Sequence, residues 1–244
     1  MLEITNSGKK GLIIFVHGLL SDKEAFLNHQ GKYFIEYLNC NKWIKDNYDY
    51  GYYIYNSAFL EPNPLKKIMR FIYPQSKPIK RNLNIQEIGE QLSKDISVYC
   101  NSYDELLLVG HSMGGLIAKS FIINCQKNIR EKILCFISLA TPHAGIPSKY
   151  IQTLTSIFSN PQFGDLSTFG IFLNNINTQW AEKRHEVNYS FFYGIHDSHV
   201  PPKYAVPVSE ANHCIPTETD HFSIARPESA ESEIVLTVAE KIKD

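Results

Sequence analysis

The sequence lacks the features that mark several common classes of protein. Its five cysteines are scattered singly and never form a Cys-x-x-Cys pair, so neither a disulfide framework nor a cysteine zinc site is expected. Its 24 Lys and Arg nearly balance 25 Asp and Glu, which gives no overall electrostatic reason to expect nucleic acid as a partner. No apolar run approaches the roughly 20 residues that span a bilayer, and no secretory signal is visible. These absences predict a cytoplasmic protein with reduced thiols.

The apolar residues that are present suffice for the core of one globular domain. Of the 244 residues, 43% are hydrophobic, and no repeat or compositional break divides them. An aromatic run at 52–55 predicts one strand. Longer apolar runs, typical of parallel strands buried on both faces, occur at 12–16, 106–109, 133–139 and 189–193. A single α/β domain over residues 1–244 with a mostly parallel sheet is expected.

Apolar residues three and four positions apart predict helices that flank this sheet. One such stripe runs from Ile85 to Tyr99, and Asn84 is its candidate N-cap. A second stripe, from Ile234 to Ile242, predicts a C-terminal helix that begins near Pro227 or Glu228.

Two stretches, at about 61–81 and 146–184, interrupt this alternation and are interpreted as insertions. The first is rich in proline and in cations, and the second contains apolar helical patterns around 151–158 and 169–176. Insertions of this size usually cover the functional edge of a sheet, as a lid or cap does.

Residues 64–81 contain a short amphipathic and cationic pattern. Leu65, Ile68 and Ile72 share one helical face, while Lys66 and Arg70 occupy other positions. One interpretation is a lid whose apolar face packs over the active site. The other is a segment that rests on an anionic membrane surface, which would favour a lipid substrate.

The candidate nucleophile is Ser112. It stands in the pattern Gly110-His111-Ser112-Met113-Gly114, directly after a predicted buried strand and directly before an apolar helix. A nucleophile on such a strained strand-to-helix turn projects its hydroxyl, and glycines on either side let the turn close tightly. The context therefore indicates nucleophilic catalysis rather than a glycine-rich turn capped by a serine.

Two backbone amides are candidates for an oxyanion hole. The N–H of Met113 lies at the positive end of the helix that follows Ser112. The second candidate is the N–H of Leu19, because His17 and Gly18 form a turn at the end of the first buried strand. His17 could instead be the catalytic base. It precedes the serine by almost a hundred residues, however, whereas the base follows the nucleophile in the architecture that places a serine on such a strand-to-helix turn.

These motifs resemble those of the α/β-hydrolases. The resemblance is to the lipase-like and esterase-like branch related to SERAC-type and GPI-inositol-deacylase-type (PGAP-like) proteins. It rests on Phe-Val-His-Gly-Leu at 15–19, Gly-His-Ser-Met-Gly-Gly-Leu at 110–116, Ala-Thr-Pro-His-Ala-Gly at 140–145 and Asp-His-Phe-Ser-Ile at 220–224. It implies a Ser-Asp-His triad, an oxyanion hole from the two turns, and no cofactor. Little chain precedes the first core strand, so the two leading strands of a full hydrolase sheet are expected to be mostly missing.

The resemblance places the acid of the triad at Asp197. This residue lies just past a predicted strand, in a segment similar to the acid loop of the family, and the acid follows the serine in this fold. Its role would be to hold the imidazole tautomer and to stabilise the imidazolium. Asp165 and Asp220 are the rival candidates, and their alternative role is turn or surface chemistry.

The resemblance places the base at His221, which lies on the last loop before the predicted C-terminal helix, in a segment similar to the histidine segment of the family. His213 and His199 also follow Asp197 and are its rivals, whereas His143 precedes the acid and is interpreted as structural. No His-Glu-x-x-His pattern accompanies these histidines, so a metal site is not expected.

The sequence therefore predicts a serine hydrolase that cleaves carboxylic esters through an acyl-enzyme intermediate. Its partner would be a small-molecule or lipid ester. Three alternatives remain open: an acyltransferase or thioesterase with the same triad, an amidase or peptidase, and a non-catalytic module with a hydrolase-like fold.

Overall fold

The computed structural model describes residues 1–18, 21–55, 85–146 and 166–243. The predicted amphipathic segment at 64–81, most of the first insertion, the helical pattern at 151–158 and the proposed cap Asn84 lie outside these residues. Within them, no helix is long and apolar enough to cross a membrane.

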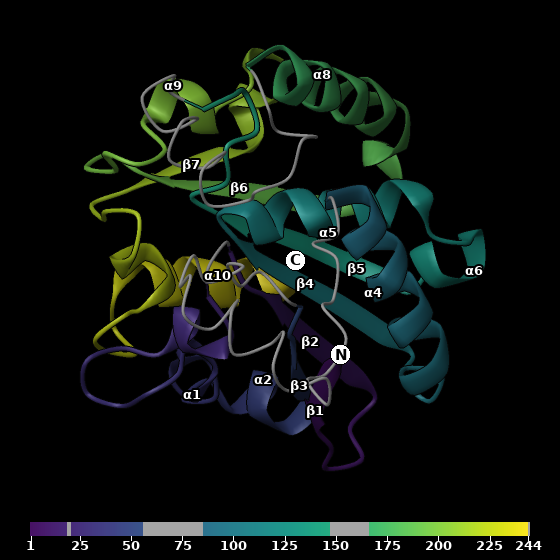
Figure 1. Ribbon diagram of the computed structural model, residues 1–244. Coiled ribbons are helices and arrows are strands. Elements are labelled where there is room, and N and C mark those ends of the chain that lie inside the picture. The colour runs from purple at the N-terminus through teal and green to yellow at the C-terminus, as the bar shows by residue number, and fades with distance from the viewer. Residues whose placement is uncertain (19–20, 56–84, 147–165, 244) are drawn as a thin grey trace, which may run out of the picture.

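Seven strands form one sheet in the order β1-β3-β2-β4-β5-β6-β7. The strands are β1 (Leu2–Thr5), β2 (Gly11–Val16), β3 (Tyr48–Tyr53), β4 (Glu105–His111), β5 (Ile133–Leu139), β6 (Asn188–Gly194) and β7 (Cys214–Thr217). Only β1 pairs antiparallel, with β3, and the other neighbours are parallel. The carboxyl ends of β2 and β4 to β7 consequently meet at one edge of the sheet (Figure 1).

Helices cover both faces of the sheet. One face packs α4 (Ile85–Tyr99), α5 (Met113–Asn124), α6 (Lys127–Arg130) and α8 (Leu166–Lys183), and the other packs α1 (Phe34–Leu38), α2 (Lys42–Asn47) and α10 (Glu233–Lys243) (Figure 1). Shorter segments complete the described chain: η1 (Lys23–Phe26), η3 (Arg184–Glu186), α9 (Pro202–Ala205), η4 (Val208–His213) and η5 (Ser223–Ala225).

Strand β2 shows why the central strands are apolar throughout. Successive side chains of a strand point to opposite faces, so Leu12 and Ile14 enter the core on the α5 side, while Ile13 and Phe15 enter the core on the α10 side. All four are almost completely buried. Four predicted strands are confirmed: the ranges 12–16, 106–109 and 189–193 lie within β2, β4 and β6, and the range 133–139 coincides with β5.

Two sequence-based boundaries were wrong, those of the strand at 52–55 and of the C-terminal helix. The strand predicted at 52–55 runs instead from Tyr48 to Tyr53, because it pairs with the whole of β2 in parallel register. The first residues of this strand are polar, so no apolar pattern marked them as part of a strand. The Asp49 carboxylate is nevertheless buried, and it accepts hydrogen bonds from the backbone amides of Ser7 and Lys9. A leading strand also exists, since β1 forms the antiparallel edge.

The C-terminal helix begins at Glu233 rather than near Pro227 or Glu228. The carbonyl oxygen of Pro227 accepts a hydrogen bond from Asn28 at 2.7 Å, and that of Glu228 accepts one from the Tyr37 hydroxyl at 3.1 Å. Because these carbonyls bond to distant side chains, they do not start a helix there. The stripe at 234–242 itself is confirmed.

Candidate active site

Ser112 occupies a strained turn between β4 and α5. Its φ of 54° and ψ of −124° place it in a backbone region that residues other than glycine rarely adopt. The turn is held because the Ser112 amide donates to the carbonyl of Leu139 at 2.8 Å, and the Gly115 amide donates to the Ser112 carbonyl at 3.1 Å. The serine side chain is half-buried and does not cap the helix, so the geometry presents the hydroxyl at the edge of the sheet.

The glycines on either side of Ser112 are required by close packing. A Cβ atom on Gly114 would lie 2.0 Å from the carbonyl oxygen of Val16, and one on Gly110 would lie 2.6 Å from the Cα of Gly115. Gly18 approaches from the neighbouring strand end, where an added Cβ would lie 3.0 Å from the Cβ of Ser112. Any larger residue would push the nucleophile turn away from β2.

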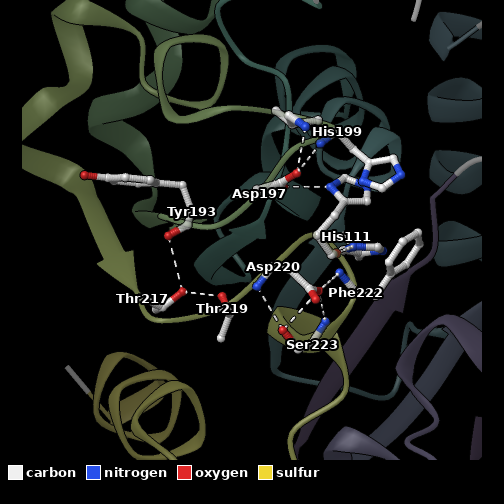
Figure 2. Close-up of polar contacts among 11 residues, drawn as sticks. His111, Tyr193, Asp197, His199, Thr217, Thr219, Asp220, Phe222 and Ser223 are labelled. Atoms are coloured by element: carbon white, nitrogen blue, oxygen red, sulfur yellow. Dashed lines mark hydrogen bonds and ion pairs between the residues drawn. The ribbon is translucent and has the colours of Figure 1, made fainter.

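Asp197 and His221 form a buried pair on the loops that follow β6 and β7. The Nδ1 atom of His221 lies 2.8 Å from Oδ2 of Asp197, the carboxylate labelled in Figure 2. The other carboxylate oxygen, Oδ1, accepts hydrogen bonds from the amides of His199 and Val200, each at 2.8 Å. Since a carboxylate only accepts, Nδ1 of His221 carries the hydrogen, and Nε2 is left with a lone pair that can take a proton.

The nucleophile turn and the Asp197–His221 pair lie side by side. The ring of His111, which precedes Ser112, is 5.1 Å from the ring of His221 between centroids. Its Nε2 atom is 2.8 Å from the backbone carbonyl oxygen of His221. The structure thus brings Ser112, Asp197 and His221 to one edge of the sheet, although they come from three different loops.

Around the candidate oxyanion hole, Met113 is described and Leu19 lies outside the described residues. Met113 is the first residue of α5, where a backbone amide has no acceptor within its own helix. On the facing turn, the ring of His17 stacks on Tyr55 with centroids 4.2 Å apart, and the Tyr55 hydroxyl donates to the carbonyls of His17 and Gly18. Sequence analysis missed Tyr55, because no local pattern distinguishes it from the other tyrosines near β3.

His17 itself is a structural residue. Burial lowers its pKa to about 4, and its two ring nitrogens contact the Gly18 carbonyl at 2.7 Å and the Tyr55 amide at 3.3 Å. Both nitrogens are therefore occupied in shaping the turn, which agrees with the order argument against a role as base.

The rival acid Asp220 stabilises a turn. Its Oδ1 atom accepts hydrogen bonds from the amides of Phe222 and Ser223, each at 2.8 Å (Figure 2). These bonds lower the pKa of the Asp220 carboxyl, and the one from the Ser223 amide has the largest effect. Burial acts in the opposite direction and raises this pKa. The other rival, Asp165, lies outside the described residues.

The remaining histidines hold other positions. His143 is buried, its Nε2 lies 2.8 Å from the Ser138 hydroxyl, and burial holds its pKa well below the usual value. His213 is exposed and stacks on Tyr189 at 4.1 Å. His199 is also exposed, and its ring stacks on that of His221 at 5.1 Å. Among the described residues, only His221 of these candidates has a hydrogen bond to Asp197 from its ring.

The described residues contain no group of three or more His, Cys, Asp or Glu side chains arranged to hold a metal ion. All five cysteines are free thiols, and burial raises the pKa of Cys125 to about 11.

Comparison with known proteins gives the fold class first. The chain is similar to the mature lipase BlEst2 of Bacillus licheniformis, with 18% identity, a TM-score of 0.56, and coverage of 92% of this chain and 91% of that one. It is also similar to a monoacylglycerol lipase of Paleococcus ferrophilus, with 15% identity, a TM-score of 0.56, and coverage of 98% of this chain and 96% of that one. A third similar structure comes from a study of carboxylesterases of Nitrososphaera gargenis, with 10% identity, a TM-score of 0.61, and coverage of 100% of this chain and 95% of that one. The fold is that of the α/β-hydrolases.

A family model narrows this class. The model described as the PGAP1-like alpha/beta domain matches residues 82–224, and the chain belongs to this family. No curated protein sequence matches the chain.

Proposed function

We propose that this protein is a serine hydrolase that cleaves carboxylic esters, with Ser112 as nucleophile, His221 as base and Asp197 as the acid. The observation that carries the proposal is the buried Asp197–His221 pair, joined at 2.8 Å, beside the strained turn that presents Ser112. The family match and the lipases among the structural neighbours support it.

The proposed reaction begins when the Ser112 hydroxyl attacks the ester carbonyl carbon and passes its proton to Nε2 of His221. The Met113 amide stabilises the negative charge that develops on the carbonyl oxygen. His221 then gives the proton to the leaving alkoxide, and an acyl-enzyme remains on Ser112. Water then attacks this ester and passes a proton to Nε2 of His221. The histidine returns that proton to the Ser112 oxygen as its bond to the acyl carbon breaks, which releases the carboxylic acid and restores the serine hydroxyl.

Asp197 makes this cycle possible by holding one tautomer of His221. Its hydrogen bond fixes the proton on Nδ1 and leaves Nε2 free to accept, and its charge stabilises the imidazolium that forms. The two amide bonds to Oδ1 fix the carboxylate from the other side.

The test is a panel of substrates that share an acyl group but differ in the bond broken. The proposal predicts turnover of p-nitrophenyl esters by the full chain and none by Ser112→Ala. Preference for the matched thioester, for the amide, or for acyl transfer to an added alcohol would replace ester hydrolysis by the corresponding alternative. No turnover with any of them would favour a non-catalytic module.

Acyl lipids are the class of ester that the segment at 64–81 favours, and this remains a proposal from the sequence. It predicts that the protein sediments with vesicles containing anionic lipid at low salt and not at high salt. A variant with Lys66, Lys67 and Arg70 changed to Gln should lose this binding. Equal binding by both proteins, or none by either, would leave the lid interpretation of the segment.

A further inference from the structure

His111 connects the strand that carries the nucleophile to the loop that carries the base. It is the last residue of β4, is 5% exposed, and immediately precedes Ser112. Its Nε2 atom lies 2.8 Å from the carbonyl oxygen of His221, 110 residues further along the chain. A carbonyl oxygen only accepts, so Nε2 of His111 must carry a hydrogen and donate it.

The surroundings of His111 keep it neutral and in this one tautomer. Burial, together with the nearby His221, lowers its pKa to about 3, although the hydrogen bond to the His221 carbonyl acts in the other direction. With the hydrogen on Nε2, Nδ1 bears a lone pair, and this atom is buried without a hydrogen-bond partner among the described residues. A buried polar atom without a partner is unfavourable, so an apolar side chain would be the better choice if filling space were the only requirement.

We propose that His111 is a positioning residue that fixes the main chain of His221 relative to Ser112. The proposal rests on the proposed function. Asp197 holds the His221 ring through Nδ1, whereas His111 holds the backbone carbonyl of the same residue. Because His111 is bonded covalently to Ser112, its hydrogen bond links the base directly to the nucleophile turn.

The alternative is that His111 merely fills the core. The centroid of its ring is 6.3 Å from that of Phe26 and 5.1 Å from that of His221, and a phenylalanine could make both contacts. Only the Nε2 hydrogen distinguishes the two roles, so the variants must separate the donor from the ring.

His111→Gln and His111→Phe make this separation. Gln carries an amide N–H at about the same distance from Cα as Nε2, but has no ring. Phe keeps the ring and lacks a donor. With a p-nitrophenyl ester we expect kcat of the Phe variant to fall by about 100-fold with little change in KM, as for misplacement of a catalytic group by about 1 Å. The Gln variant should stay within about fivefold of wild type.

If the Phe variant does not fold, His111→Asn takes its place, since its amide nitrogen matches Nδ1 and does not reach the His221 carbonyl. Thermal unfolding of every variant shows whether a loss of kcat merely follows a loss of stability. A Phe or Asn variant with wild-type kcat would overturn the proposal. Equal losses of kcat in the Gln and Phe variants would also overturn it, because the donor would then make no difference.

A second readout does not depend on turnover. The Nδ1 proton shared by His221 and Asp197 gives a low-field proton resonance, which is assigned by its loss in Asp197→Asn. We expect the Gln variant to retain this resonance and the Phe variant to shift or broaden it. An unchanged resonance in the Phe variant would refute positioning by His111, whereas absence of esterase activity in the wild type would refute the proposed function instead.

Discussion

The amino and carboxyl ends of the strands in this sheet contain different kinds of buried polar group. At the amino ends, Asp49 accepts hydrogen bonds from two backbone amides and from the Tyr103 hydroxyl, and Tyr48 donates to Glu105. At the carboxyl ends, His17 and His111 are buried with pKa values lowered to about 4 and about 3. The carboxylates at the amino ends are thus held by neutral donors, whereas these two imidazoles at the carboxyl ends are themselves neutral at pH 7.

Backbone strain follows the same division. Among the described residues other than glycine, positive φ occurs only at Ser112 and Ala140, which directly follow β4 and β5. Strained residues persist only where their surroundings determine them, and they cluster at functional sites. Backbone strain among the described residues other than glycine is therefore confined to the end of the sheet that carries the proposed site.

The largest expected effect is the loss of activity in Asp197→Asn. The amide cannot hold the His221 tautomer, so kcat for ester hydrolysis should fall by about 10⁴-fold, which steady-state kinetics would measure. Asp220→Asn is the matched control, since Asp220 stabilises a turn of the loop that carries His221, and it should stay within a few-fold of wild type. The reverse order would assign the acid to Asp220.

Gly114→Ala should damage both stability and activity at the carboxyl end. Its Cβ would lie 2.0 Å from the Val16 carbonyl oxygen, and overpacking of this kind costs about 3 kcal/mol. The control is Gly170→Ala in α8, where an added Cβ has no atom within 4 Å, and a gain of up to about 1 kcal/mol is expected. Urea unfolding measures both values, and equal stability of the two variants would contradict the packing argument.

Asp49→Ala tests the amino end alone. It leaves two partly buried backbone amides and the buried Tyr103 hydroxyl without their acceptor, so the free energy of unfolding should fall by about 2 kcal/mol. The kcat for ester hydrolysis, measured well below the unfolding temperature, should remain that of the wild type. A loss of kcat in the folded variant would show that the two ends are not independent.

Two buried cations on the α5 side of the sheet, Lys119 and Arg130, have different partners. Arg130 pairs with Glu186 at 2.8 Å, but fully buried Lys119 donates to the neutral amide of Asn177 at 2.7 Å. Burial lowers the pKa of Lys119 from 10.5 to about 7. The unfolded chain therefore binds more protons between about pH 7 and 10.5, and this residue makes stability rise with pH across that window.

Lys119 should contribute a slope of about 1.4 kcal/mol per pH unit to the dependence of the free energy of unfolding on pH. Denaturant unfolding of wild type and Lys119→Met at pH 7.5 and 8.5 measures it, because the difference in stability between the two proteins should move in favour of the wild type as pH rises. A difference that does not change between these pH values would show that the lysine remains charged in the folded protein.

The sequence predicted the parts of this architecture that depend on local pattern. Apolar runs identified β2, β4, β5 and β6, and the pattern around Ser112 identified the turn between β4 and α5. Residues Asp197 and His221 could be chosen through the family resemblance, and the structure brings them into hydrogen-bond contact.

The features that sequence analysis missed depend on contacts between distant residues. The start of α10 is set by Asn28 and Tyr37, which lie 199 and 191 residues before the carbonyls that they bind. Strand β7, Cys-Ile-Pro-Thr, has no distinctive pattern and is defined by its pairing with β6. The bond from His111 to His221 is likewise invisible until the fold brings the two loops together.

The most direct test of the central claim is the site of covalent labelling by a fluorophosphonate. This reagent reacts with a serine that an adjacent base activates, and peptide mass spectrometry locates the adduct. The account predicts a single adduct on Ser112 in the wild type and no labelling in a folded Ser112→Ala variant. A wild-type protein that is not labelled, or an Ala variant that is labelled as fully as the wild type, would contradict it.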